Sequence, residues 1–354
     1  MAQRLLMKGN EAISEAAIRA GCRHYFGYPI TPQNEISAYM SKRMPQVEGL
    51  FLQAESEIAS ISMVLGAAAA GARAMTSSSS PGISLKTEGI SFLAGSDLPA
   101  VIVNIQRGGP GLGSIQPAQS DYNQATKALG HGDMRALVLA PYTVQEMADF
   151  VLRLFDLTEK YRMPGLMLCD GMLGQMMEPV QFPETSVKPS DKPWATTGHQ
   201  NKRGSNIVNS LALQPDVLEE QNIMRARRYA KIQESETLAE NFLCGDAEIL
   251  VVAYGASARV ARSAVSAARR QGIKAGLLRP ITLWPFPKKE LEAATVSAKA
   301  LLTVEMSMGQ MVDDVKCAVE FKKPVHFFGR TGGVIPTPAE VLGQLKNLAQ
   351  GVGS

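Results

Sequence analysis

The stretch VIVNIQRGGPGLG, residues 101–113, joins a mostly apolar run to a glycine-rich loop. The apolar run, 101–106, is typical of a strand that is buried on both faces of a parallel sheet. The loop that follows contains too much glycine and proline to form regular structure. Because ligands of open α/β sheets bind where the strands end, the sequence predicts a binding site near Arg107.

Strands and helices alternate on both sides of this stretch. The order strand, helix, strand is typical of a parallel sheet with helical connections. The expected strands are residues 24–28, 50–53, 74–77, 101–106, 137–140 and 165–168, and the expected helices are 9–21, 35–43, 55–71 and 144–161. The sequence therefore predicts an α/β fold, with a first domain over residues 1–182.

The residue pattern changes after the first domain. Residues 183–214 are rich in Pro, Ser, Thr, Asn and Lys, and 216–242 have the charged pattern of a solvent-facing helix. We therefore expect a linker and connecting helix over 183–244 and a second, smaller α/β domain over 245–354. Its sheet should contain about four parallel strands. These strands are expected at residues 249–254, 275–278, 300–305 and 325–328.

The composition excludes several classes of protein. Of the 354 residues, 45% are hydrophobic and 19% are charged, which excludes disorder and a coiled coil. The net charge of +3 and the absence of a basic run argue against a nucleic-acid partner. No apolar segment reaches the roughly 20 residues that a membrane helix needs, and no secretory signal follows Met1. We expect a cytoplasmic protein without a membrane partner.

The four cysteines, Cys22, Cys169, Cys244 and Cys317, are too widely spaced to form a ligand cluster. This chain alone is therefore not expected to hold a zinc ion or an iron–sulfur cluster. The simplest interpretation is buried free thiols in a reducing compartment.

Glu57 and Arg107 are the candidates for chemistry. Glu57 begins a helical segment whose next turns are almost wholly apolar, so its carboxylate should be partly desolvated; the alternative is a helix-capping acid. Arg107 can grip a substrate carboxylate with two donors, or it can tie the loop to nearby carbonyl groups. The loop lacks a Walker lysine, and Asp170-Gly171 lacks the further ligands of a magnesium motif, so we interpret Asp170 as a strand-end turn residue.

Three motifs in the first third of the chain resemble those of the α subunit of the 2-oxoacid:ferredoxin oxidoreductases. They are Tyr28-Pro29-Ile30-Thr31-Pro32, Ala54-Glu55-Ser56-Glu57 and Gln106-Arg107-Gly108-Gly109-Pro110. The resemblance extends along the chain to Gly329-Arg330-Thr331-Gly332-Gly333. It implies a pyrimidine-type thiamine diphosphate-binding domain followed by a domain like the C-terminal domain of transketolase.

The resemblance also implies partners. Thiamine diphosphate would lie between this chain and a β subunit, which supplies the diphosphate and Mg²⁺ site. Other chains, including ferredoxin-like and γ subunits, would complete the complex, and 4Fe-4S clusters on partner subunits would pass electrons to ferredoxin. This chain itself would then contribute no metal ligand.

By the same resemblance, Glu57 hydrogen-bonds the aminopyrimidine ring and favours the tautomer that can remove the thiazolium proton. Pro29 and Ile30 also belong to the implied cofactor site. Thr31 and Arg107 match residues beside the substrate. The implied reaction is oxidative decarboxylation of a 2-oxoacid with coenzyme A, giving acyl-CoA, CO₂ and reduced ferredoxin.

The substrate is expected to be a branched-chain 2-oxoacid. Residues 78–86 and 111–117 most resemble the 2-oxoisovalerate (3-methyl-2-oxobutanoate) branch of the family. The alternatives are 2-oxoglutarate, pyruvate or an aryl 2-oxoacid. Two further hypotheses stay open at this point. One is a self-sufficient thiamine enzyme of the transketolase kind, although the missing magnesium motif argues against it. The other is a non-catalytic scaffold subunit of an electron-transfer complex.

Overall fold

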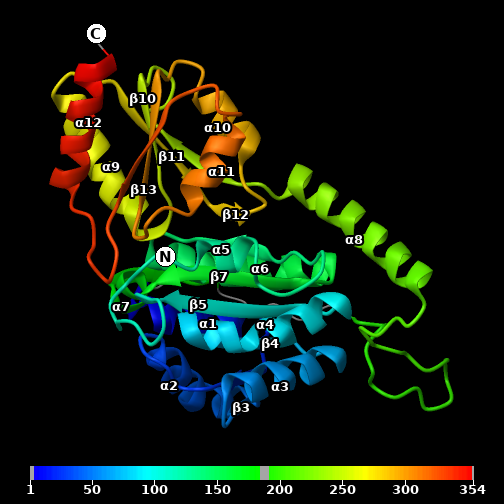
Figure 1. The fold of residues 1–354 in the computed structure, drawn as a ribbon. Coiled ribbons are helices and arrows are strands. Elements are labelled where there is room, and N and C mark those ends of the chain that lie inside the picture. Colours follow the sequence, from blue (N-terminus) through cyan, green and yellow to red (C-terminus); the bar gives the residue numbers. More distant parts are fainter. Residues whose placement is uncertain (1–3, 184–190, 353–354) are drawn as a thin grey trace.

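The computed structural model describes residues 4–183 and 191–352 (Figure 1). Within these residues, a seven-stranded sheet lies below a five-stranded sheet in the view of Figure 1, and a third sheet has two strands. No helix in the described part is both long and apolar enough to cross a membrane. The α/β fold predicted from the sequence is confirmed.

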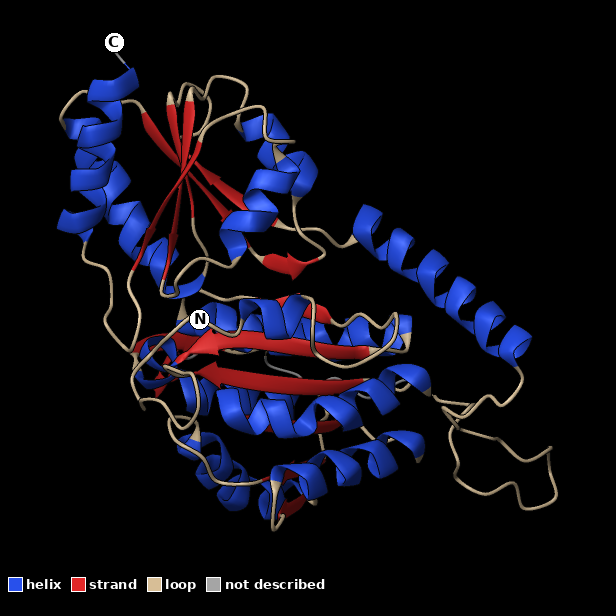
Figure 2. Ribbon diagram, in the orientation of Figure 1, coloured by secondary structure: helices blue, strands red, loops and turns tan. Residues whose placement is uncertain are grey.

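The seven-stranded sheet is built around β5 (Ala100–Gln106), which is buried at every position. Parallel pairing joins β5 to β4 and β7, and the strand order is β12-β6-β7-β5-β4-β2-β3. The other strands are β2 (His24–Gly27), β3 (Leu50–Gln53), β4 (Ala74–Ser78), β6 (Leu137–Leu139), β7 (Pro164–Asp170) and β12 (Thr282–Trp284). Because β5 and β7 run the same way, their carboxyl ends lie at one edge of the sheet (Figure 2).

Helices cover this sheet. In α6, apolar side chains at helical spacing are buried, and the Thr143 hydroxyl caps the helix by accepting from the Glu146 N–H at 3.1 Å. α1 packs against α6, and α3 packs against α4. The helices are α1 (Gly9–Arg19), α2 (Asn34–Arg43), α3 (Glu57–Ala69), α4 (Ser80–Gly95), α5 (Tyr122–Thr126), α6 (Val144–Tyr161) and α7 (Gly171–Gln175), with a 3₁₀ turn at Met44–Val47.

The second sheet has the order β14-β13-β10-β11-β9. It contains the four predicted parallel strands and a fifth, antiparallel one. The strands are β9 (Ala239–Phe242), β10 (Ile249–Val252), β11 (Ala275–Pro280), β13 (Ala300–Glu305) and β14 (Val325–Gly329). The helices are α8 (Pro215–Ser235), α9 (Gly255–Arg270), α10 (Lys288–Ala294), α11 (Met311–Ala318) and α12 (Pro338–Val352). Residues 191–214 contain no helix or strand, and α8 runs along the outside of the molecule (Figure 1).

The prediction of one helix over 216–242 is wrong at its C-terminal end. The helix stops at Ser235, and Ala239–Phe242 forms the antiparallel edge strand β9 on β11. Glu240 in this strand binds Arg262 and Arg279. Pairing with the edge of the second sheet therefore overrides the helical preference of Ala and Glu at these positions.

The sequence pattern also misses three short strands. β12 belongs to the second half of the chain, but it pairs antiparallel with β6 at the edge of the first sheet. β1 (Arg4–Lys8) and β8 (Met177–Gln181) form the two-stranded antiparallel sheet. The domain limits at 182 and 245 stay a prediction, but β12 makes the first sheet depend on residues from beyond them.

The cysteines only partly match the expectation of buried thiols. Cys22 and Cys169 are buried and Cys244 is half-buried, but Cys317 is exposed, so the prediction is wrong for it. The reason is helical geometry: the buried face of α11 contains Met311, Val315 and Ala318, and Cys317 lies off this stripe.

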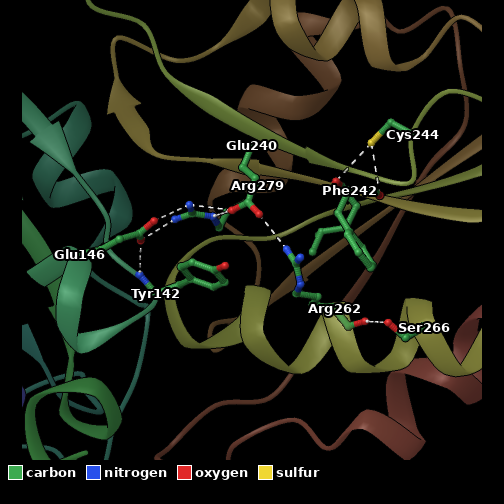
Figure 3. Close-up of polar contacts among 9 residues, drawn as sticks. Tyr142, Glu146, Glu240, Phe242, Cys244, Arg262, Ser266 and Arg279 are labelled. Atoms are coloured by element: carbon green, nitrogen blue, oxygen red, sulfur yellow. Dashed lines mark hydrogen bonds and ion pairs between the residues drawn. The ribbon is translucent and has the colours of Figure 1, made fainter. Parts of the chain in front are cut away.

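A buried arginine joins the two halves of the molecule (Figure 3). Arg279 on β11 is 2% exposed and donates to both carboxylate oxygens of Glu146 on α6, at 2.9 and 2.7 Å. Its Nε donates to Glu240 at 2.9 Å, and its guanidinium lies 3.9 Å from the centre of the Tyr142 ring. Glu240 also accepts from Arg262 on α9 at 2.7 Å. This network ties α6 of the first sheet to β9, β11 and α9 of the second.

Candidate active site

Glu57 is the first residue of α3. The preceding Ser56 caps the helix by accepting from the Ala59 N–H at 3.1 Å, which fixes the start of the helix at Glu57. Glu57 is 5% exposed, as its apolar sequence context predicts. Among residues 4–183 and 191–352, no donor makes a hydrogen bond to its carboxylate. A buried carboxylate that is left free in this way is suited to a donor on a ligand.

A recess surrounds this carboxylate. A Cβ added to Gly82 in α4 would lie 2.1 Å from Ser78 Oγ and 2.5 Å from Glu57 Oε1, so a side chain at that position would fill the space. The hydroxyl groups of Ser78 and Ser79 are buried and have no hydrogen-bond partner in the described part of the chain. The recess thus combines a glycine wall with unsatisfied polar atoms.

Arg107 stands where β5 ends, and it is 6% exposed. Its Nη1 donates to the Thr31 carbonyl at 2.9 Å and its Nη2 donates to the Leu112 carbonyl at 3.2 Å. These bonds are the loop-anchoring contacts that the sequence left as one alternative. Its Nε is buried without a partner among the described residues, so one donor stays available for a ligand.

Thr31 belongs to the turn after β2. Its hydroxyl accepts from Asn34 Nδ2 at 3.3 Å and retains its own hydrogen as a donor. Pro29 is exposed and Ile30 is half-buried, and no hydrogen bond in the described residues joins either of them to Glu57. The structure therefore brings Thr31 directly to Arg107, whereas Glu57 approaches the pair only through the first turn of α4.

The first turn of α4 carries that connection. The Ser80 hydroxyl accepts from the Arg107 N–H at 3.0 Å and donates to Asp121 Oδ2 at 2.6 Å. Asn104 also donates to this carboxylate, at 2.9 Å. Burial raises the pKa of Asp121, although these two hydrogen bonds oppose the rise. Sequence reasoning missed this cluster because its members come from three distant segments.

Three further groups were not assigned to the site from the sequence. Gln33 accepts from Ser77 at 2.6 Å and donates to the Tyr28 carbonyl at 3.1 Å, so it supports the turn that contains Thr31. The loop 329–333 meets the loop 107–117: a Cβ added to Gly333 would lie 2.3 Å from Gln116 Cβ. Lys86 lies fully buried behind Glu57. For Lys86 a signal exists, because it shares helical spacing with Ile83 and Ile90.

Asp170 ends β7 and begins α7, as predicted for a strand-end turn residue. Its Oδ1 accepts from the N–H groups of Met172 and Leu173 at 3.0 and 3.1 Å. Its Oδ2 accepts from the Ala256 N–H of α9 at 3.3 Å. Complete burial raises its pKa to about 6, against the opposing effect of these bonds. Within the described residues, no three His, Cys, Asp or Glu side chains gather in a group that could hold a metal ion.

This raised pKa predicts a pH-dependent stability. The folded state binds the Asp170 proton more tightly than the unfolded state, so this contribution is present below about pH 4 and is lost as pH rises through about 6. From pH 5 to 7 the wild type should lose about 1 kcal/mol relative to Asp170→Asn, which does not titrate. Thermal midpoints of the native complex against pH measure this, with exposed Asp133→Asn as the control. Parallel curves for wild type and Asp170→Asn would contradict the prediction.

Comparison with known proteins agrees with this fold. The family model described as pyruvate flavodoxin/ferredoxin oxidoreductase, thiamine diphosphate-binding, matches residues 15–239. The model described as pyruvate:ferredoxin oxidoreductase core domain II matches residues 247–341.

Individual relatives cover the whole chain. Ketoisovalerate oxidoreductase subunit VorB of Methanothermobacter thermautotrophicus is 50% identical over 97% of this chain and 97% of its own length. The 2-oxoglutarate synthase subunit KorA of the same organism is 35% identical over 98% of this chain and 99% of its own length.

Solved structures have the same fold. The 2-oxoglutarate:ferredoxin oxidoreductase of Magnetococcus marinus superposes with a TM-score of 0.87 at 26% identity, over 99% of this chain and 66% of that chain. A split-gene transketolase superposes with a TM-score of 0.61 at 14% identity, over 97% of this chain and 98% of that chain, which shows the fold alone. The chain therefore belongs to the 2-oxoacid:ferredoxin oxidoreductase family and is a subunit of such an enzyme.

Proposed function

We propose that the chain is the α subunit of a cytoplasmic complex that oxidatively decarboxylates a branched-chain 2-oxoacid with coenzyme A and reduces ferredoxin. The observation that carries the substrate is the difference in identity between two groups of relatives. The ketoisovalerate subunits are 50% identical to this chain, and the 2-oxoglutarate subunits are 34–36% identical to it. 2-Oxoglutarate is the second candidate, because the family resemblance extends equally along those chains.

The family model is that of a thiamine diphosphate-binding domain, and the recess at Glu57 fits part of this cofactor. A free, buried carboxylate can hydrogen-bond an aminopyrimidine ring, and the orphaned hydroxyl groups of Ser78 and Ser79 offer further polar contacts. We assign Glu57, Pro29 and Ile30 to the cofactor site. The diphosphate and Mg²⁺ would be held by a β subunit, and the 4Fe-4S clusters by partner chains that include ferredoxin-like and γ subunits.

When bound, thiamine diphosphate supplies the electron sink that decarboxylation of a 2-oxoacid requires. The contribution of this chain is proton placement and substrate orientation. Glu57 would hold a proton at a ring nitrogen, and its burial would keep water from competing for that hydrogen bond. Because α3 begins at Glu57, the helix cap at Ser56 fixes where the carboxylate lies.

Arg107 and Thr31 would orient the substrate. The unpartnered Nε of Arg107 can donate to the carboxylate of a 2-oxoacid, and the Thr31 hydroxyl can donate beside it. The two bonds from Arg107 to loop carbonyl groups hold the guanidinium in place for this task. Anchoring the loop and binding the substrate are thus compatible roles of one side chain.

Arg107→Lys should mainly weaken substrate capture. Lysine keeps a positive charge but cannot reach two carbonyl groups and a carboxylate with a planar fork of donors. Loss of one hydrogen bond to a charged group should raise KM about 10- to 100-fold with a smaller change in kcat. Steady-state kinetics of the complex measure this, with exposed Arg135→Lys as the control. Unchanged KM and kcat would leave Arg107 only its loop-anchoring role.

The proposed function is tested by coenzyme A-dependent dye reduction. The native complex is captured through this chain and assayed side by side with 2-oxoisovalerate, 2-oxoglutarate, pyruvate and an aryl 2-oxoacid. Preference for 2-oxoisovalerate supports the proposal, and preference for another acid overturns the substrate while keeping the reaction. No turnover of any acid, with bound thiamine diphosphate and intact clusters, would favour the scaffold alternative.

A further inference from the structure

Lys86 is a lysine in a core position. It lies on α4 between Ile83 and Ile90, on the face that packs against α3, and it is 0% exposed. Lysine is almost never fully buried unless its charge is paired, because the ammonium group loses its hydration. In the described part of the chain, no carboxylate lies within ion-pair distance of Lys86.

Neutral oxygens surround the ammonium group. Lys86 Nζ donates to the main-chain carbonyl of Glu57 at 3.3 Å, to Thr76 Oγ1 on β4 at 3.1 Å, and to Ser60 Oγ on α3. Three donors therefore meet three acceptors, and two of the acceptors belong to the first turn of α3. This geometry holds the backbone of Glu57 from within the core.

Helix α4 contacts both the side chain and the main chain of Glu57. Gly82 faces the Glu57 carboxylate, and Lys86, one turn later on α4, holds the Glu57 carbonyl. Of the groups that face Lys86 from α3 and β4, Ser60 and Thr76 carry no charge, and Glu57 is the ionisable group whose charge acts on it. Glu88 on α4 itself is exposed.

We propose that Lys86 is a positioning residue for Glu57, which holds its backbone and supplies the positive charge that balances its carboxylate in the recess. The proposal rests on the proposed role of Glu57 and adds a residue to it. Lys86 makes its hydrogen bonds to groups of the protein itself. It acts through the position of Glu57 and through the positive charge that it places beside the recess.

The charge of Lys86 should depend on pH near neutrality. Burial lowers the pKa of Lys86 to about 7, and the Glu57 charge opposes this change. When Lys86 loses its proton, the recess loses the positive charge that the Glu57 charge acts on.

The test compares Lys86→Met, which removes donors and charge, with Lys86→Gln, which keeps donors but removes the charge. The pH profile of kcat for the wild type should have a limb near pH 7 that belongs to Lys86. In both Lys86 variants this limb should disappear, because the group that titrates is gone. Calorimetric titration of the cofactor-free complex with thiamine diphosphate gives a second readout, in which the pH dependence of the affinity near pH 7 should also be lost in both variants.

Controls separate positioning from packing. Thr76→Val and Ser60→Ala remove hydrogen-bond acceptors but keep the charge, so they should lower the thermal midpoint and leave the limb in place. Exposed Lys42→Met should change nothing. If the limb remains in both Lys86→Met and Lys86→Gln, Lys86 is structural and the proposal is wrong. If Glu57→Gln itself keeps normal turnover, the proposed role of Glu57 fails first, and the proposal fails with it.

Discussion

Glu57→Gln should lower kcat about 10²- to 10⁴-fold while the complex still assembles, since this is the usual contribution of a positioned general acid or base. Glutamine keeps the size of the side chain and one carbonyl acceptor, so the packing against Gly82 survives. It cannot hold and release the proton. The expected loss therefore falls on turnover, and the thermal midpoint and subunit composition should stay unchanged.

Glu55→Gln is the matched control. Glu55 is exposed and precedes the Ser56 cap, so it carries the same chemistry two residues away without the burial. The measurement is dye reduction at saturating 2-oxoacid and coenzyme A, with thiamine diphosphate content determined for each variant. Normal turnover of Glu57→Gln at full cofactor content would remove Glu57 from the mechanism.

Arg279→Met should destabilise the protein by about 3 kcal/mol. Breaking a buried ion pair costs roughly 3–5 kcal/mol, and the lower end applies here because both partners are partly exposed. The side-chain exposures are 21% for Glu146 and 31% for Glu240. Methionine fills much of the volume against Tyr142 but leaves these two carboxylates without their shared cation.

Denaturant unfolding of the complex measures this change, followed by a signal from this chain. Arg270→Met is the control, because Arg270 is exposed in the last turn of α9. If Arg279→Met and Arg270→Met unfold at the same denaturant concentration, the network does not stabilise the contact between the two sheets.

Much of the fold could be predicted because it follows from periodicity. The run 101–106 becomes β5 in the centre of the first sheet, and the predicted helix 144–161 matches α6. The missed strands are segments in which distant pairing decides the structure, and helix α4 was also missed, because residues 77–80 and Pro81-Gly82 were interpreted as a loop. Ala239–Phe242 has helix-forming residues and becomes a strand because β11 offers an edge, and three-residue β12 has no pattern of its own.

The candidate site also contains residues that could be predicted from the sequence and residues that could not. The positions of Glu57 and Arg107 could be predicted because each stands at a boundary, a helix start and the end of a strand. The alternatives for Arg107 could not be separated, because both use the same donors. Lys86 shares helical spacing with Ile83 and Ile90, but it was missed because lysine in a helix is usually solvated.

Strand β12 has a consequence for anyone who divides this protein. A fragment that ends at residue 244 would lack β12 and would leave the outer edge of β6 with unpaired N–H and C=O groups. An edge strand with unpaired backbone groups can pair with the same strand of another copy, so such a fragment should self-associate when expressed alone. A chimaera with a relative would likewise have to exchange residues 282–284 together with the first sheet. Residues 282–284 and the first sheet therefore form one structural unit, although they are far apart in the sequence.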